Sequence, residues 1–204
     1  MSEFWEENFA GKQEMWGLEP AQSARVAGDL FREKGVKSVL IPGIGYGRNA
    51  RVFRESGIEV TGIEISETAI GLARKHFGTG MVIHHGSVTD MPFDNRLYDG
   101  IFCYGLVHLL DTAERAKLIA DCYNQLEENG YMVFTAITKD APTYGQGTPV
   151  GEDRFEMFGG VKMFFYDRIS VEKEFAKAGL FEITEITESY PFYLIQCRKA
   201  KPGF

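Results

Sequence analysis

The chain has 204 residues and a net charge of −7 at pH 7. This length predicts a single domain with a core that needs no disulfide or metal to hold it. The acidic balance argues against sequence-independent binding to nucleic acid or to an anionic membrane, because both require a basic surface. No apolar run reaches the about 18 residues of a membrane span, and residues 1–10 lack the features of a signal peptide. We therefore expect a cytoplasmic protein whose three scattered cysteines are reduced.

Strand and helix patterns alternate through most of the chain. Helices are expected over residues 20–34, 47–55, 66–77 and 111–129, and strands over residues 36–42, 58–64, 81–84, 98–103 and 131–137. This alternation predicts a parallel sheet with helices on both faces.

The end of the chain departs from this alternation. A helix expected over residues 167–178 precedes two strands, 181–188 and 193–198, which are joined only by a Ser-Tyr-Pro turn. Because this turn is too short for a parallel crossover, the two strands should pair antiparallel. The predicted fold class is therefore α/β, a Rossmann-like, doubly wound, seven-stranded and mostly parallel sheet with a C-terminal antiparallel hairpin.

Two segments lie outside this pattern, although we expect a single domain over residues 1–204. Residues 138–166 are rich in glycine and aromatic side chains, and they are too long for an ordinary loop, which predicts an insertion or substrate lid. Residues 1–19, which include Trp5 and Trp16, are the second lid candidate.

A glycine loop between the first strand and the next helix is the strongest functional signal. Gly43, Gly45 and Gly47 follow the apolar run at alternate positions, and Glu64 ends the second strand. The glycines permit a sharp turn and a close ligand, and the helix behind them offers free N–H groups. A carboxylate at Glu64 can hold both hydroxyls of a ribose. Together they predict a cofactor that contains a nucleoside.

The spacing of the glycines favours one kind of cofactor. A dinucleotide site has a third glycine three residues after the second, where this chain has Arg48. The observed spacing suits an adenosyl ligand without a pyrophosphate, with a nicotinamide cofactor as the alternative. The structural alternative is a tight turn that only packs closely, with Glu64 in solvent.

These segments together resemble the class I S-adenosylmethionine-dependent methyltransferases over residues 20–200. The motifs that carry the resemblance are the glycine loop, Glu64 with Ile65, GSVTDMPF (Gly86–Phe93) and YDGIFCYGLVHLL (Tyr98–Leu110). The run Gly47–Ala50 resembles the small-molecule branch that includes the tellurite-resistance-type enzymes.

The resemblance implies S-adenosylmethionine as the cofactor and a small-molecule methyl acceptor, with no nucleic-acid or membrane partner and a monomeric or homodimeric chain. It implies cofactor contacts by the glycine loop and by Asn49, Glu64, Ile65, Ser87, Val88, Cys103 and Trp16. The acid that usually precedes the glycine loop is replaced by Ile41. The methionyl amino group would then depend on the backbone carbonyls of Gly43 and Cys103.

Methyl transfer from a sulfonium depends on alignment and on exclusion of water more than on acid or base catalysis. His108 is the candidate base, with helix capping or packing as its structural alternative, and Tyr104 is a candidate contact to the methionyl end or the acceptor. No metal is expected, because the histidines lack acids or cysteines at metal spacing. Arg154 and Lys162 could hold an anionic acceptor.

Two other functions stay open at this point. A nicotinamide-dependent oxidoreductase is disfavoured by Arg48, by the terminal hairpin and by the absence of a Tyr-x-x-x-Lys pair. A non-catalytic module that binds an adenosyl ligand would use the same fold and would differ only in showing no turnover.

Overall fold

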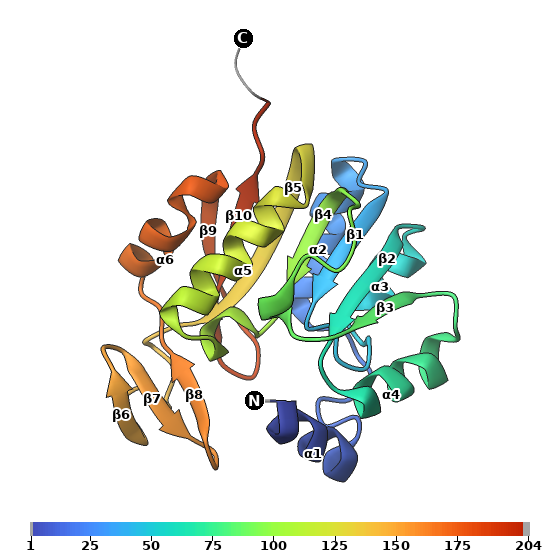
Figure 1. Cartoon of the computed structure of the whole chain (residues 1–204). Coiled ribbons are helices and arrows are strands. Elements are labelled where there is room, and N and C mark those ends of the chain that lie inside the picture. Colours follow the sequence, from blue (N-terminus) through green and yellow to red (C-terminus); the bar gives the residue numbers. More distant parts are fainter. Residues whose placement is uncertain (1, 202–204) are drawn as a thin grey trace.

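A computed structural model describes residues 2–201, and a seven-stranded sheet forms its centre (Figure 1). The strands are β1 (Ser38–Pro42), β2 (Glu59–Glu64), β3 (Val82–His85), β4 (Tyr98–Cys103), β5 (Leu126–Ile137), β9 (Leu180–Thr187) and β10 (Pro191–Arg198). Their order is β3-β2-β1-β4-β5-β10-β9; β1 to β5 run parallel, and β10 is antiparallel to both β5 and β9. The predicted fold class, including the antiparallel hairpin, is confirmed.

The helices are α1 (Ser2–Lys12), α2 (Gln22–Glu33), α3 (Ala50–Glu55), α4 (Glu67–Phe77), α5 (Thr112–Asn124) and α6 (Arg168–Phe175), with short 3₁₀ turns η1 (Val88–Asp90), η2 (Val107–Leu109) and η3 (Ala176–Ala178). Helices α2 to α6 cover the two faces of the sheet, and α1 lies at one end of it (Figure 1). Val39 and Ile41 pack with α2 and α3, whereas Leu40 between them packs with α5 and α6. Successive strand side chains therefore enter two separate cores, which is why β1 is a continuous apolar run.

Two helices differ from their predicted limits. The helix expected over residues 111–129 ends at Asn124, because Leu126 pairs with Tyr98 of β4 and Asn129 takes a left-handed φ of 64° that an α-helix does not allow. The helix expected from residue 47 begins at Ala50, since Gly47 has a φ of 84°.

The segment 138–166 contains a second, antiparallel sheet of three strands, β6 (Thr148–Gly151), β7 (Arg154–Met157) and β8 (Val161–Phe164). Figure 1 shows this small sheet and α1 at the same end of the main sheet, where the parallel strands end. The two segments predicted as lids thus lie at the edge where ligands bind in such folds. Their action as lids stays a prediction.

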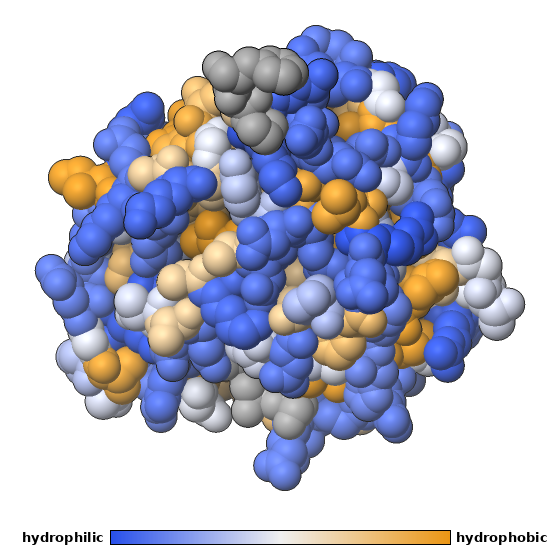
Figure 2. Space-filling view, turned by 45° about the horizontal axis from the view of Figure 1, so that its top comes forward, coloured by the Kyte–Doolittle hydropathy of each residue, from blue (hydrophilic) through white to orange (hydrophobic). Residues whose placement is uncertain are grey.

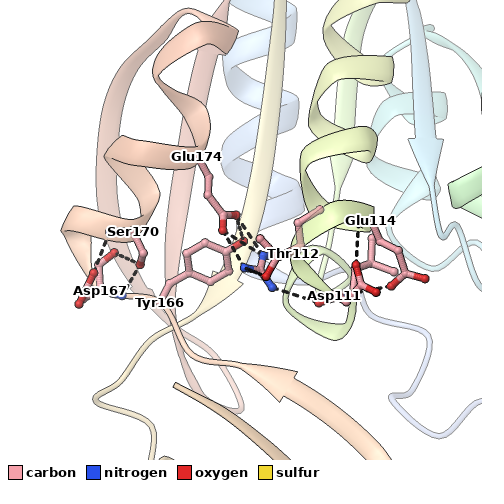
Figure 3. A network of polar contacts seen from close by, with 9 residues as sticks. Asp111, Thr112, Glu114, Tyr166, Asp167, Ser170 and Glu174 are labelled. Carbon is pink, nitrogen blue, oxygen red and sulfur yellow. Dashed lines mark hydrogen bonds and ion pairs between the residues drawn. The ribbon is translucent and has the colours of Figure 1, made fainter. Parts of the chain in front are cut away.

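A polar network ties the small sheet to the main fold (Figure 3). Glu174 of α6 accepts hydrogen bonds from the Arg115 guanidinium at 2.8 Å and from the Tyr166 hydroxyl at 2.7 Å. The same guanidinium lies 4.0 Å from the ring centre of Phe164 in β8. The point where β8 returns to the main sheet is therefore fixed by a buried charge pair and an aromatic contact.

Figure 2 is turned by 45° from Figure 1, so that the end of the sheet remote from α1 comes forward, and on this face it shows mostly hydrophilic residues with hydrophobic ones scattered between them. No helix within residues 2–201 combines the length and the apolar character needed to cross a bilayer.

Candidate cofactor and acceptor site

A cavity of about 500 Å³ opens at the carboxyl ends of the parallel strands. Of the residues predicted to contact the cofactor or to take part in catalysis, all but Gly47 and Cys103 line it; those that do are Gly43, Gly45, Asn49, Glu64, Ile65, Ser87, Val88, Tyr104, His108 and Trp16. Side chains of α1 and of the small sheet complete the lining. The topology therefore brings together residues from distant parts of the chain into one hollow of ligand-pocket size.

The glycines of the loop have different tasks. Gly43, Gly45 and Gly47 have φ angles of 68°, 59° and 84°, a region that favours glycine. A Cβ on Gly45 would lie 3.8 Å from the Phe9 ring, an ordinary contact, so at this position the positive φ and not crowding favours glycine. Gly45 also lines the cavity. A Cβ on Gly47 would lie 2.8 Å from the Phe77 ring, so this glycine serves packing against α4 and does not reach the cavity.

The Glu64 carboxylate is buried, which excludes the solvated alternative. It accepts N–H bonds from Gly45 at 2.8 Å, Ile65 at 2.9 Å and Ser66 at 3.0 Å. Burial raises the pKa of this carboxyl, against the opposing effect of these three donors. Because Oε1 takes two of the bonds and Oε2 only one, the carboxylate retains one acceptor position, on Oε2. Only one oxygen, and not both, is thus available to a further donor.

This end of the cavity fits an adenosyl group. Gly43 and Gly45 line this end without side chains, Glu64 offers an acceptor, and the neighbouring Ile65 and Val88 provide apolar surface. Ser87 also lines the cavity, and its hydroxyl lies 2.7 Å from that of Thr89 while accepting the Thr89 N–H. The cofactor contacts of these residues stay predictions.

Helix α1 covers the glycine loop. Phe9 is buried against Tyr46 with 3% of its surface exposed, and Trp16 stacks on the Tyr46 ring with centroids 6.3 Å apart. Glu6 accepts hydrogen bonds from the hydroxyls of Ser66, at 2.6 Å, and Thr68, which lower the pKa of the Glu6 carboxyl. Sequence analysis missed Glu6, because nothing in the sequence connects it with residues some sixty positions later.

Tyr104 is held by a residue that sequence analysis also missed. Its hydroxyl donates to the Glu188 carboxylate at 2.7 Å, and the Ser23 N–H donates to the other carboxylate oxygen at 2.8 Å. Burial raises the pKa of the Tyr104 phenol, followed by the charge of Glu188. The phenol therefore stays protonated at neutral pH, and Glu188, from the turn between β9 and β10, fixes its direction.

His108 lies on η2 and is buried, with 4% of its surface exposed. Burial lowers the pKa of its imidazole to about 3, so the ring is neutral at pH 7. Its Nδ1 accepts a long bond, 3.5 Å, from the Ile137 N–H. A group with so low a pKa is a weak proton acceptor. The role of His108 as a base stays a prediction.

Cys103 does not line the cavity, because its side chain is fully buried below the loop that follows β4. Burial raises the pKa of its thiol, which keeps it protonated and unreactive. In the part of the chain that the structure describes, no group of three or more His, Cys, Asp or Glu side chains could hold a metal ion.

A second hollow of about 250 Å³ adjoins the cavity beside the small sheet. Phe4, Trp5, Leu109 and Val161 line both hollows, and Arg154 and Lys162 line only the second. Three aromatic residues of the insertion pack together: the Tyr144 ring lies on Phe155 and Phe165, with centroids 5.7 and 5.5 Å away. Phe158, in contrast, is 61% exposed and lines the main cavity. The insertion therefore combines a satellite core with a wall of the second hollow.

Comparisons with known proteins point to one class. Residues 40–134 match the family model described as Methyltransferase domain. An ubiquinone biosynthesis O-methyltransferase of Aromatoleum aromaticum is 30% identical over 113 residues, which are 53% of this chain and 47% of the relative. The O-methyltransferase cnsE of Penicillium expansum is 29% identical over 136 residues, 59% of this chain and 48% of the relative. The chain thus spans about half the length of these curated relatives.

A solved structure extends the comparison to nearly the whole chain. It is a 1,6-didemethyltoxoflavin-N1-methyltransferase of Burkholderia thailandensis, with bound 1,6-didemethyltoxoflavin and S-adenosylhomocysteine. The TM-score is 0.77 at 16% identity, and the match covers 98% of this chain and 87% of the other. The fold is therefore that of a methyltransferase.

Proposed function

We propose that this protein transfers a methyl group from S-adenosylmethionine to a small-molecule acceptor. One observation carries the proposal: the segment that matches the methyltransferase domain, residues 40–134, is also the segment that supplies the glycine loop, Glu64 and Tyr104 to the cavity. The named relatives, which are O- and N-methyltransferases, support the same chemistry.

Each part of the cavity then has a binding task. The open Oε2 position of Glu64 accepts a ribose hydroxyl, and Ile65 and Val88 pack against the adenine. The backbone carbonyl of Gly43, which lines the cavity, holds the methionyl amino group. The contact predicted for the Cys103 carbonyl stays a prediction, because Cys103 does not line the cavity. When bound, S-adenosylmethionine supplies a methyl group already activated on a sulfonium.

The protein's own contribution to the reaction is alignment and exclusion of water. Alignment of two reactants can supply about 7–11 kcal/mol without any acid or base. Tyr104, held by Glu188, and the neutral His108 shape the wall where the acceptor meets the methyl group, and α1 with Trp16 shields the site from solvent. Transfer proceeds by direct in-line displacement, with no covalent intermediate on the protein.

The finer assignments belong to the same proposal. The likeness of Gly47–Ala50 to the tellurite-resistance-type branch, the monomeric or homodimeric state and the cytoplasmic location all stay predictions.

Calorimetric titration with S-adenosylmethionine, S-adenosylhomocysteine and NADH tests the proposal. We expect both adenosyl ligands to bind and NADH not to bind. Glu64→Gln should weaken the adenosyl ligands about ten-fold or more, or 1.4 kcal/mol, because an amide cannot supply the same acceptors. Glu67→Gln is the matched control, since this side chain is 81% exposed.

Two results would redirect the assignment. Binding of NADH without S-adenosylhomocysteine would favour the oxidoreductase. Binding of the adenosyl ligands without transfer of radiolabelled methyl to any acceptor in a broad panel would favour the non-catalytic module.

A further inference from the structure

Arg154, in β7, is a cation at the outer end of the site without an anionic partner. Among residues 2–201, no carboxylate oxygen lies within 4.0 Å of its guanidinium. Its Nε is buried and has no hydrogen-bond partner. The Arg154 side chain as a whole is part-exposed, and it lines the second hollow. A guanidinium that lines a hollow and has no carboxylate partner is available to bind an anionic ligand.

The acids close to Arg154 are engaged elsewhere. Asp153, its neighbour in the chain, pairs with Lys139 at 2.6 Å and accepts the Tyr144 hydroxyl at 2.7 Å. Glu156 lies opposite Lys162 in the small sheet, at 3.9 Å. Asp153 and Glu156 therefore pair with lysines, and neither forms an ion pair with Arg154.

The second hollow continues from the site where methyl transfer is proposed. Leu109, Trp5 and Val161 line both spaces, and Met163 and Phe192 lie on the side of the main cavity. All five are apolar or aromatic. A molecule whose reacting atom lies beside Tyr104 and His108 can therefore extend over an apolar surface and end at the Arg154 guanidinium.

Building on the proposed methyl transfer, we propose that the acceptor has an apolar, aromatic body and carries a carboxylate that binds Arg154, with Lys162 beside it. The planar guanidinium fork matches a carboxylate in two parallel N–H···O bonds, which a lysine alone cannot provide. The aromatic lining accepts a flat body, and the terminal nitrogens of the guanidinium offer the donors that a carboxylate can reach from the hollow.

Matched pairs of ligands that differ only in charge test this inference. The protein saturated with S-adenosylhomocysteine is titrated calorimetrically with benzoate and benzamide, cinnamate and cinnamamide, and 2-naphthoate and 2-naphthamide. At least one carboxylate should bind about ten-fold more tightly than its amide. Arg154→Gln should abolish this preference, and Arg154→Lys, which keeps the charge without the fork, should retain part of it.

A control variant removes the same charge elsewhere. Arg168→Gln changes an exposed cation of α6 that pairs with Glu172 and lies in neither hollow, so the preference should survive. Unchanged binding of S-adenosylhomocysteine by Arg154→Gln shows that this variant is folded.

The inference is overturned if no carboxylate binds better than its amide, if neither member of any pair binds, or if the preference survives Arg154→Gln. The proposed function would fail in a different way: the unaltered protein would not bind S-adenosylhomocysteine at all. The two failures are therefore distinguishable in one set of titrations.

Discussion

His108 and Glu64 line the same cavity, and burial shifts the pKa of each towards its neutral form. A buried histidine loses charge by a lowered pKa and a buried carboxyl by a raised one, because removal of water penalises the ionised state. Glu64 retains three backbone donors that oppose this effect, whereas no charged partner opposes it at His108. The imidazole is therefore the more strongly affected of the two.

The depressed pKa of His108 makes the protein less stable in acid. The unfolded chain binds a proton at the ordinary value of 6.5 and the folded chain only near 3, so stability is lost as pH falls below 6.5. The free energy of unfolding then falls by up to about 1.4 kcal/mol for each pH unit. Urea unfolding at about pH 7 and about pH 5 should show that His108→Gln loses about 2 kcal/mol less than the unaltered protein between these values. Equal losses in the two proteins would contradict the buried, neutral imidazole.

Sequence patterns identified site residues that lie at fixed positions in a strand–turn–strand motif. They did not identify residues that reach the site through contacts between distant parts of the chain. Gly43, Gly45 and Glu64 could be found because a strand, a turn and a second strand lie in a fixed order. Glu188 could not, because it meets Tyr104 from 84 positions away, through a turn with no motif of its own. The alternating spacing likewise gave no means of separating Gly47, which faces Phe77, from Gly45, which faces the cavity.

At the level of elements, α1 is joined to α4 by the Glu6 carboxylate and by the packing of Phe9 with Ala69 and Leu72. The carboxylate bonds the Ser66 hydroxyl, which caps α4, and the hydroxyl and N–H of Thr68. Glu6→Gln replaces one acceptor oxygen by a donor, so α1 should separate more often from the glycine loop. Hydrogen exchange of the α1 amides should become faster, and the emission of Trp5 and Trp16, the two tryptophans of the chain, should shift to longer wavelength.

Glu7→Gln is the matched control for this variant, because Glu7 is the next residue of α1 and is exposed. Its exchange and emission should equal those of the unaltered protein. An equal effect of both substitutions would show that α1 responds to the loss of any negative charge and not to the loss of the Glu6 contacts.

The elements that sequence analysis did not resolve have weak local patterns. Strands β6, β7 and β8 have four residues each, and the four residues of β6 are all exposed. Only β7, with the sequence RFEM, alternates polar and apolar residues throughout, and four residues are too few to predict a strand. Helix α1 mixes polar and aromatic residues without a clear apolar face. Among its residues 3–12, Phe9 is the only one that is buried. Both elements are defined by packing against the rest of the molecule.

For the whole molecule, the sheet could be predicted because the cores on its two faces require a simple apolar pattern in the sequence. Strands that are buried on both faces are continuous apolar runs, and the short link before β10 permits only antiparallel pairing with β9. The position of the small sheet relative to the cavity was not predictable. It depends on the contact of Arg115 with Phe164, Tyr166 and Glu174, which lie in segments 49 or more positions apart from it in the chain.

This network predicts an asymmetry in global stability. The Arg115 side chain is 3% exposed and that of Glu174 is 19% exposed. Loss of the Glu174 carboxylate therefore leaves the Arg115 charge buried without its partner, whereas loss of the Arg115 guanidinium leaves the Glu174 charge where water can reach it. Glu174→Gln should lower the free energy of unfolding by about 3 kcal/mol or more. Arg115→Met should cost less, because methionine fills much of the volume beside Phe164. Glu172→Gln, which breaks an exposed pair on the same helix, should change it by less than about 0.5 kcal/mol. Urea unfolding of the three variants measures these differences, and a larger loss for Arg115→Met would mean that packing on Phe164, and not the buried charge, secures the small sheet.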